Sequence, residues 1–192
     1  MKILFAVGRL SVGGAEKLLI NQLPDINRRI FDPYLITLFP EQENSFQDKL
    51  FFEKEKWRTF DFRRLLNFIE WYKLFKFLKK EKFDAVITSL FSANLIVRIA
   101  AILTGIPVII SYEHNIYPDK HRWQIIADKI LSYWTDKIIV DSDAARVFTA
   151  EQENIPLEKF LLLYIPPLLD MSRAKPGSET SVAISNQPRR AG

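Results

Sequence analysis

The chain has 192 residues, of which 48% are hydrophobic and 13% aromatic, and its formal net charge is +4. This composition predicts one sizeable domain and excludes global disorder, while the lack of cysteine excludes disulfides and cysteine-ligated metals. The apolar residues 3–7 are too few for a signal-peptide core, and the apolar stretch 95–110 is interrupted by Arg98, Gly105 and Pro107. We therefore expect a cytoplasmic protein without a membrane span.

Short apolar runs alternate with helical patterns along the chain. In chain order we expect strands at residues 2–8, 34–39, 57–60, 84–89, 107–112, 137–140 and 160–164, and helices at 14–29, 65–81, 92–104, 121–134 and 143–153. Gly105 is expected to cap a helix, and Pro24 should bend or split the first one. Most strands are continuously apolar, so we predict an α/β fold: a doubly wound, mostly parallel sheet with helices on both faces.

The last residues, 171–192, have a different character. They are mostly polar, contain two prolines and show no sustained period. We expect a flexible tail there, so that the domain itself covers residues 1–170.

A glycine pair follows the first strand, in "GRLSVGGAEKLL" at residues 8–19. The loop fits neither the G-x-G-x-x-G dinucleotide fingerprint nor a P-loop, because Gly14-Ala15 stands where a P-loop has Lys-Ser/Thr. Ligands of open α/β sheets bind beyond the carboxyl ends of the strands, and glycine lets a ligand approach the backbone. Gly13 and Gly14 are therefore candidate binding residues, with a plain tight turn as the alternative.

The fifth strand ends in "PVIISYEHNIY", which places Glu113, His114 and Asn115 at the same edge of the sheet. His114 could hydrogen-bond a sugar hydroxyl or stabilise developing charge, and Asn115 beside it could bind substrate. The alternative is a histidine satisfied by loop backbone. A metal site built from His114, Asp119 and His121 is a weaker alternative, because such ligand sets come from separated elements. We expect neither a metal nor a cofactor.

Three segments together resemble the N-terminal domain of family 4 glycosyltransferases: "MKILFAVGRLSVGGAEKLLINQL", "SANLIVRIAAILTGIPVIISYEHN" and "ADKILSYWTDKIIVDSDAARVF". These are retaining, metal-independent enzymes of the GT-B fold. The resemblance implies that Gly13 and Gly14 approach the acceptor and the donor phosphates, that Glu16 supports the helix start, and that His114 faces the transferred sugar.

The resemblance also extends past the sixth strand. Ser142 and Arg146 match a "vS-x-x-x-R" segment of the family and are candidate substrate-binding residues. A helix N-cap at Ser142 and a surface arginine at Arg146 are equally good interpretations.

The chain departs from the family in three places. The family often has a histidine after the fourth strand, where this chain reads Thr88-Ser89-Leu90-Phe91, and its hinge is replaced by "YIPPLLD". The family's paired glutamates, eight positions apart in the donor domain, have no counterpart in these 192 residues. The resemblance thus implies an acceptor-binding half, which would use a nucleotide sugar together with a missing donor domain or a separate donor-domain chain.

A basic, aromatic helix covers residues 63–82, with seven lysines and arginines against two glutamates, a net +5. Its apolar stripe is expected to be Trp71, Leu74, Phe75 and Leu78, which would leave Phe77 as extra apolar surface. The cations that could contact an anionic membrane surface at the inner face are Arg64, Lys73, Lys76 and Lys80. One alternative is an ordinary helix with a buried apolar stripe and a solvated basic face. A second is nucleic-acid binding, but the sequence contains no recognised binding motif, so we do not expect nucleic acid as a partner.

Two functions follow from these patterns. The first is the acceptor-binding half of a retaining glycosyltransferase, which transfers a sugar from a nucleotide sugar to a glycan or lipid-linked acceptor and is inactive without its other half. The second is a non-catalytic half-domain that binds a glycan, a lipid carrier or a second subunit. A sugar-nucleotide epimerase of the same fold is a third interpretation, although no residue favours it.

Overall fold

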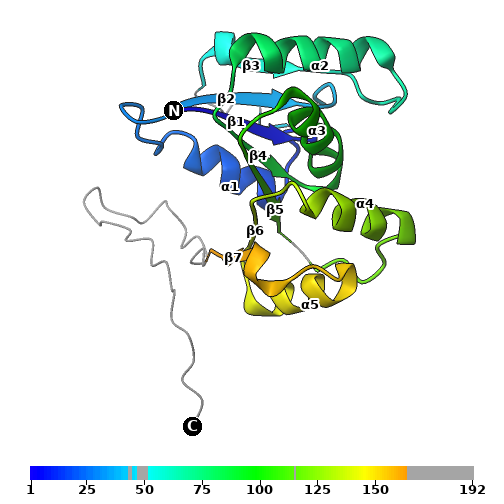
Figure 1. The fold of residues 1–192 in the computed structure, drawn as a ribbon. Helices are drawn as coiled ribbons and strands as arrows, with labels where there is room; N and C mark the ends of the chain where they lie inside the picture. Colours follow the sequence, from blue (N-terminus) through cyan, green and yellow to red (C-terminus); the bar gives the residue numbers. More distant parts are fainter. Residues whose placement is uncertain (43–44, 47–51, 115, 164–192) are drawn as a thin grey trace, which may run out of the picture.

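The protein is described by a computed structural model that covers residues 1–42, 45–46, 52–114 and 116–163. Within these residues lies one sheet of seven parallel strands in the order β3-β2-β1-β4-β5-β6-β7 (Figure 1). The strands are β1 (Lys2–Val7), β2 (Asp32–Thr37), β3 (Trp57–Thr59), β4 (Ala85–Ser89), β5 (Val108–Glu113), β6 (Lys137–Val140) and β7 (Phe160–Leu162).

Five α-helices connect and cover these strands: α1 (Gly14–Gln22), α2 (Phe68–Glu81), α3 (Phe91–Thr104), α4 (Arg122–Ser132) and α5 (Asp143–Glu153). The short 3-10 turns η2 (Lys54–Lys56) and η3 (Leu157–Lys159) lead into β3 and β7. Helices α2, α3, α4 and α5 lie side by side in that order, whereas α1 packs on the opposite face of the sheet (Figure 1). The predicted α/β, parallel, doubly wound arrangement is confirmed.

The core has an apolar layer on each face of the sheet. One cluster fills the space between the sheet and helices α2 and α3, with Leu4, Leu74 and Val97 fully enclosed. A smaller cluster lies under α1 and includes Leu19 and Leu35. The central strands β1, β4 and β5 are therefore largely buried, which is why their sequences read as nearly continuous apolar runs, whereas the edge strand β3 is mostly exposed.

The predicted elements agree with the observed ones except at some ends. Helix α1 stops at Gln22, seven residues before the predicted end, because Pro24 lacks the N–H that would continue the helix. Helix α3 ends as predicted at Gly105, whose φ of 75° is the left-handed conformation that glycine adopts without strain. Residues 164–192 lie outside the described part of the chain, so the 1–170 boundary and the tail stay predictions.

The prediction that Phe77 adds exposed apolar surface is wrong. Phe77 is 4% exposed, and its ring packs against Phe60 and Phe83 at centroid distances of 6.2 and 5.4 Å. The buried side of α2 is centred on Leu74 and Phe77 rather than on the stripe through Trp71 and Phe75, which are only partly buried. Among the described residues, no helix has the length and hydropathy to cross a membrane.

The strand order places a topological switch between β1 and β4. From β1 the chain winds outward to β2 and β3, and from β4 it winds the other way to β5, β6 and β7. The loops that follow β1 and β4 therefore diverge at the carboxyl edge, which is the edge where ligands of this fold class bind. The predicted glycine loop follows β1, and the predicted histidine follows β5, one strand beyond the switch.

Candidate functional site

The loop after β1 is fixed by two close approaches. A Cβ atom on Gly8 would lie 2.9 Å from the Oγ of Ser92, so glycine allows the end of β1 to meet the first turn of α3. A Cβ atom on Gly13 would lie 2.4 Å from the Oε2 of Glu16. The buried Glu16 carboxylate folds back over Gly13 and accepts a hydrogen bond of 3.0 Å from the Ser11 hydroxyl. Glu16 thus stabilises the loop at the start of α1 through its hydrogen bond with Ser11.

The two glycines of the pair have different surroundings. Gly13 is the N-cap of α1 with extended φ and ψ of −149° and 167°, so its own backbone does not require glycine, but a side chain there would displace the Glu16 carboxylate. Gly14 has no atom within 4 Å of the place that a Cβ would take. Gly14 is exposed at the start of α1. The first backbone N–H groups of a helix and the positive end of its dipole suit an anionic or hydroxyl-bearing ligand.

The loop after β4 carries backbone strain. Leu90 has φ 68° and ψ 155°, a region that is essentially reserved for glycine and costs on the order of 1–3 kcal/mol for other residues. Leu90 is the N-cap position of α3, directly across the switch from the glycine loop. Strain of this kind gathers where the surrounding structure dictates a loop shape, as at ligand sites.

His114 follows directly on β5, and its ring stacks on that of Tyr112 with a centroid distance of 3.8 Å and an interplanar angle of 24°. Burial lowers the pKa of His114 to about 4, so the imidazole is neutral at pH 7. Its Nε2 is enclosed and has no hydrogen-bond partner among the described residues. The neutral ring therefore carries a buried polar atom whose hydrogen-bonding capacity the described residues leave unused. Asn115 lies outside the described residues.

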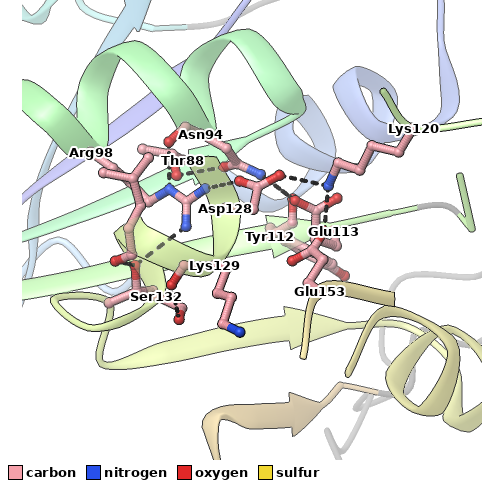
Figure 2. Close-up of polar contacts among 12 residues, drawn as sticks. Thr88, Asn94, Arg98, Tyr112, Glu113, Lys120, Asp128, Lys129, Ser132 and Glu153 are labelled. Carbon is pink, nitrogen blue, oxygen red and sulfur yellow. Dashed lines mark hydrogen bonds and ion pairs between the residues drawn. The ribbon is translucent and has the colours of Figure 1, made fainter. Parts of the chain in front are cut away.

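A buried hydrogen-bond chain supports the end of β5 from behind. The Thr88 hydroxyl donates to Asn94 Oδ1 at 2.6 Å, and Asn94 Nδ2 donates to Glu113 Oε1 at 2.7 Å (Figure 2). These three residues come from β4, α3 and β5, so the chain ties the loop containing His114 to the switch point. Burial raises the pKa of the Glu113 carboxyl, and nearby Lys120 acts in the opposite direction.

A buried ion network continues from this chain. Arg98 binds the Asp128 carboxylate, which also pairs with Lys120 Nζ at 2.6 Å, and Lys120 reaches Glu153 at 2.5 Å (Figure 2). The four side chains are at most 5% exposed. Burial raises the pKa of Glu153 to about 7, and the carboxylates around Lys120 raise the pKa of its ammonium group.

Sequence reasoning missed this network. Its signal is the spacing of Asn94 and Arg98, the two strongly polar residues of the apolar helix α3, which are four apart and so share one face. Their partner Asp128 lies on α4, the next helix in the layer. No local pattern pairs them, since that pairing depends on how the helices pack.

A cavity of about 400 Å³ opens beside the network at the carboxyl edge. Its walls include the aromatic rings of Phe91 and Tyr117 together with the charged groups of Glu113 and Lys120. Apolar ring faces beside a carboxylate and an ammonium group are suited to a ligand with both apolar C–H faces and hydroxyl groups.

The remaining candidates behave as local helix structure. Ser142 is the N-cap of α5, and its hydroxyl accepts the Ala145 N–H at 3.1 Å. Arg146 pairs with Asp143 at 2.8 Å one turn away, while its Nε is enclosed without a hydrogen-bond partner among the described residues. Across the part of the chain that the structure describes, no group of three or more potential metal ligands forms.

The comparisons agree with this architecture. The sequence model described as Glycosyltransferase Family 4 matches residues 12–164. No curated protein sequence matches the chain significantly.

Solved structures share the fold at low sequence identity. HepE from Anabaena, solved in complex with UDP, superposes with a TM-score of 0.67 at 18% identity, over 85% of this chain and 44% of its own. The lipopolysaccharide outer core galactosyltransferase WaaB gives 0.65 at 17% identity, over 87% and 46%. The UDP-GlcNAc 2-epimerase from Methanocaldococcus jannaschii gives 0.58 at 15%, over 85% and 45%. The chain thus spans less than half the length of each, and the likeness concerns the fold.

Proposed function

Since this chain belongs to glycosyltransferase family 4, we propose that it is the acceptor-binding half of a retaining glycosyltransferase. It would transfer a sugar from a nucleotide sugar to a glycan or lipid-linked acceptor, together with a donor domain. The observation that carries the proposal is the position of two features on one sheet edge. These are the exposed start of α1 at Gly14 and the unpartnered Nε2 of His114.

The protonation state of His114 limits its role. A neutral imidazole can donate or accept one hydrogen bond with a sugar hydroxyl, but it adds no positive charge to the site. Stabilisation of the leaving diphosphate would therefore come from the N–H groups at the start of α1 and from cations of the donor domain. His114 would hold the transferred sugar in position.

The acceptor would enter the cavity beside Glu113 and Lys120. The Phe91 ring offers an apolar face for the C–H surface of a sugar, and the exposed side chains of Asp119 and His121 in the same lining can hydrogen-bond its hydroxyls. Two structural neighbours support a nucleotide-sugar reaction, since HepE was solved in complex with UDP and WaaB is a galactosyltransferase.

Exposed apolar side chains at the carboxyl edge support a docked donor domain, whether in the same polypeptide or in a separate chain. Val12 follows β1, Ile116 follows β5, and Trp123 begins α4, and all three are exposed. Apolar side chains grouped at a functional edge are typical of an interaction surface.

Association with an anionic membrane at the inner face of the cell membrane is part of the proposal. The acidic residues of helices α2, α3 and α4 are Glu70 and Asp128, both buried, and Glu81, which pairs with Lys2. The exposed cations of these three helices include Lys76 and Lys80. Their exposed apolar side chains are Phe68, Ile69, Tyr72, Leu103, Trp123, Ile126 and Ile130. Apolar and aromatic side chains flanked by cations are characteristic of interfacial binding.

Co-sedimentation with vesicles tests the membrane part. Anionic vesicles should retain the chain and neutral ones should not, and replacement of Arg64, Lys73, Lys76 and Lys80 by glutamate should abolish the difference. Equal retention on both vesicle types would argue against membrane association.

A transfer assay separates the two functions predicted from the sequence. The chain is incubated with UDP-, GDP- or ADP-sugars carrying a label, and with a membrane lipid extract. Incorporation that His114→Ala removes would support turnover at this site. Absence of incorporation from both proteins would favour the alternative, a non-catalytic half-domain that binds a glycan, a lipid carrier or a subunit.

A further inference from the structure

A second hollow lies away from the carboxyl-edge cavity, between the edge strand β3 and helix α2. Its volume is about 660 Å³. In the sheet, β2 and β1 separate β3 from β4, so this hollow belongs to the opposite half of the fold from His114 and the cavity beside Lys120. We call it the β3–α2 groove. The residues that define it are Arg58 and Thr59 of β3, and Lys73, Lys76, Phe77 and Lys80 of α2.

The acidic groups of the groove are already occupied. Asp61 accepts two hydrogen bonds from the Arg63 guanidinium, at 2.8 and 2.5 Å. The buried Glu70 carboxylate binds Lys73 at 2.6 Å and also accepts the Asp61 backbone N–H at 3.2 Å. Neither carboxylate is left to neutralise the other cations of the groove.

Three cations of the groove remain without an acidic partner. Within the described ranges, Arg58, Lys76 and Lys80 form no ion pair. The Arg58 guanidinium lies 4.9 Å from the centroid of the Phe77 ring, and that ring is fixed in the core. One cation is therefore held in place before any ligand arrives, which lowers the entropy lost on binding.

The edge strand adds a backbone donor. Phe60 donates its N–H to Thr37 of β2 at 2.8 Å, and Phe62 donates its N–H to Leu38, the residue after β2, at 2.9 Å. Because successive N–H groups of a strand alternate in direction, the N–H of Thr59 points away from β2, to the side where β3 has no neighbouring strand. A planar guanidinium, two ammonium groups and an outward-facing N–H of an edge strand match the oxygens of a phosphate group.

We propose that the β3–α2 groove binds a phosphomonoester or diphosphate group, supplied by the headgroup of a membrane lipid. Leu65, Leu66, Phe68 and Ile69, next to the groove at the start of α2, are exposed, the second and third by 80% each. A headgroup held in the groove would leave its acyl chains beside these side chains. The lipid source rests on the proposed membrane association, whereas the phosphate site itself does not.

The test compares two double variants that remove the same charge. Lys76→Gln with Lys80→Gln empties the groove of two cations. The control variant, Lys79→Gln with Lys129→Gln, removes two lysines outside the groove. Lys79 lines a separate hollow with Leu103, and Lys129 lies on α4. Inorganic pyrophosphate is titrated into each protein by calorimetry, and circular dichroism checks the fold.

The groove variant should lose pyrophosphate affinity by about tenfold or more, while the control pair stays close to the wild type. Equal losses in the two variants would overturn the proposal, because they would show a general charge effect. Absence of pyrophosphate binding to the wild type would overturn it as well.

Vesicles then identify the source of the phosphate. Phosphatidylcholine vesicles are prepared with phosphatidic acid, a phosphomonoester, or with phosphatidylglycerol, a phosphodiester, at matched surface charge. Preference for phosphatidic acid that only the groove variant loses supports the lipid source, and equal binding overturns it in favour of a soluble phosphate compound. If pyrophosphate binds through the groove but no vesicle binds, the membrane association is wrong and the phosphate site stands.

Discussion

The neutral state of His114 has a measurable effect on stability. Burial lowers its pKa from 6.5 to about 4, so the unfolded chain binds the proton more readily than the folded one between these values. The stability that depends on a neutral His114 is fully present above pH 6.5 and is lost as the pH falls toward 4. At pH 5, about 1.5 units below the unfolded pKa, the loss is about 2 kcal/mol, because each unit corresponds to about 1.4 kcal/mol.

The comparison with His114→Gln isolates this effect. Burial raises the pKa of Glu153 to about 7, so the folded chain binds this proton at a higher pH than the unfolded chain does. Glu153 therefore adds stability as the pH falls, in the wild type and in His114→Gln alike. Urea unfolding at pH 7 and pH 5 should show that the wild type loses about 2 kcal/mol more than His114→Gln over this range.

Proton NMR provides a direct readout of the same state. The chain has two histidines, so a His121→Asn variant assigns the His114 signal. That signal should not titrate between pH 8 and 5.5. A titration centred near pH 6.5, or the same pH dependence of unfolding in the wild type and His114→Gln, would refute the reasoning.

Three substitutions test the surrounding geometry by urea unfolding. Gly13→Ala should cost up to about 1 kcal/mol, because its Cβ would displace the Glu16 carboxylate, 2.4 Å away, from its hydrogen bond with Ser11, whereas Gly14→Ala should be neutral or stabilising by up to about 1 kcal/mol. Equal effects at the two glycines would contradict their different surroundings. Arg98→Met should cost about 3 kcal/mol, since it leaves the buried Asp128 carboxylate with one cation fewer, and a loss below about 1 kcal/mol would argue against the network.

The strands and helices could be predicted because their signals are local. Continuous apolar runs mark strands buried on both faces, and all seven predicted strands are present within a few residues of their expected ends. Pro24 and Gly105 marked helix ends through backbone chemistry that needs no tertiary information.

The orientation of α2 could not be predicted in the same way. Several apolar stripes are compatible with its sequence, and the choice is made by Phe60 and Phe83, which come from other parts of the chain and enclose Phe77. The exposed apolar side chains are instead those at the start of the helix, such as Phe68.

The candidate site was predictable in position but not in detail. The glycine pair and His114 were visible as residues that follow strands, and strand order decides which loops meet. The carboxylate over Gly13 and the ion network behind Glu113 depend on side chains meeting across elements. That information is absent from residue spacing, as the pairing of Arg98 with Asp128 over 30 positions shows.

The central claim is that the carboxyl edge binds a sugar acceptor. The most direct measurement presents the immobilised chain to a membrane lipid extract and identifies retained lipids by mass spectrometry, beside an Asp119→Trp variant that fills the cavity beside Lys120. The wild type should retain sugar-bearing or phosphate-linked lipids that the Asp119→Trp variant does not retain. Retention of none, or equal retention by both proteins, would contradict it.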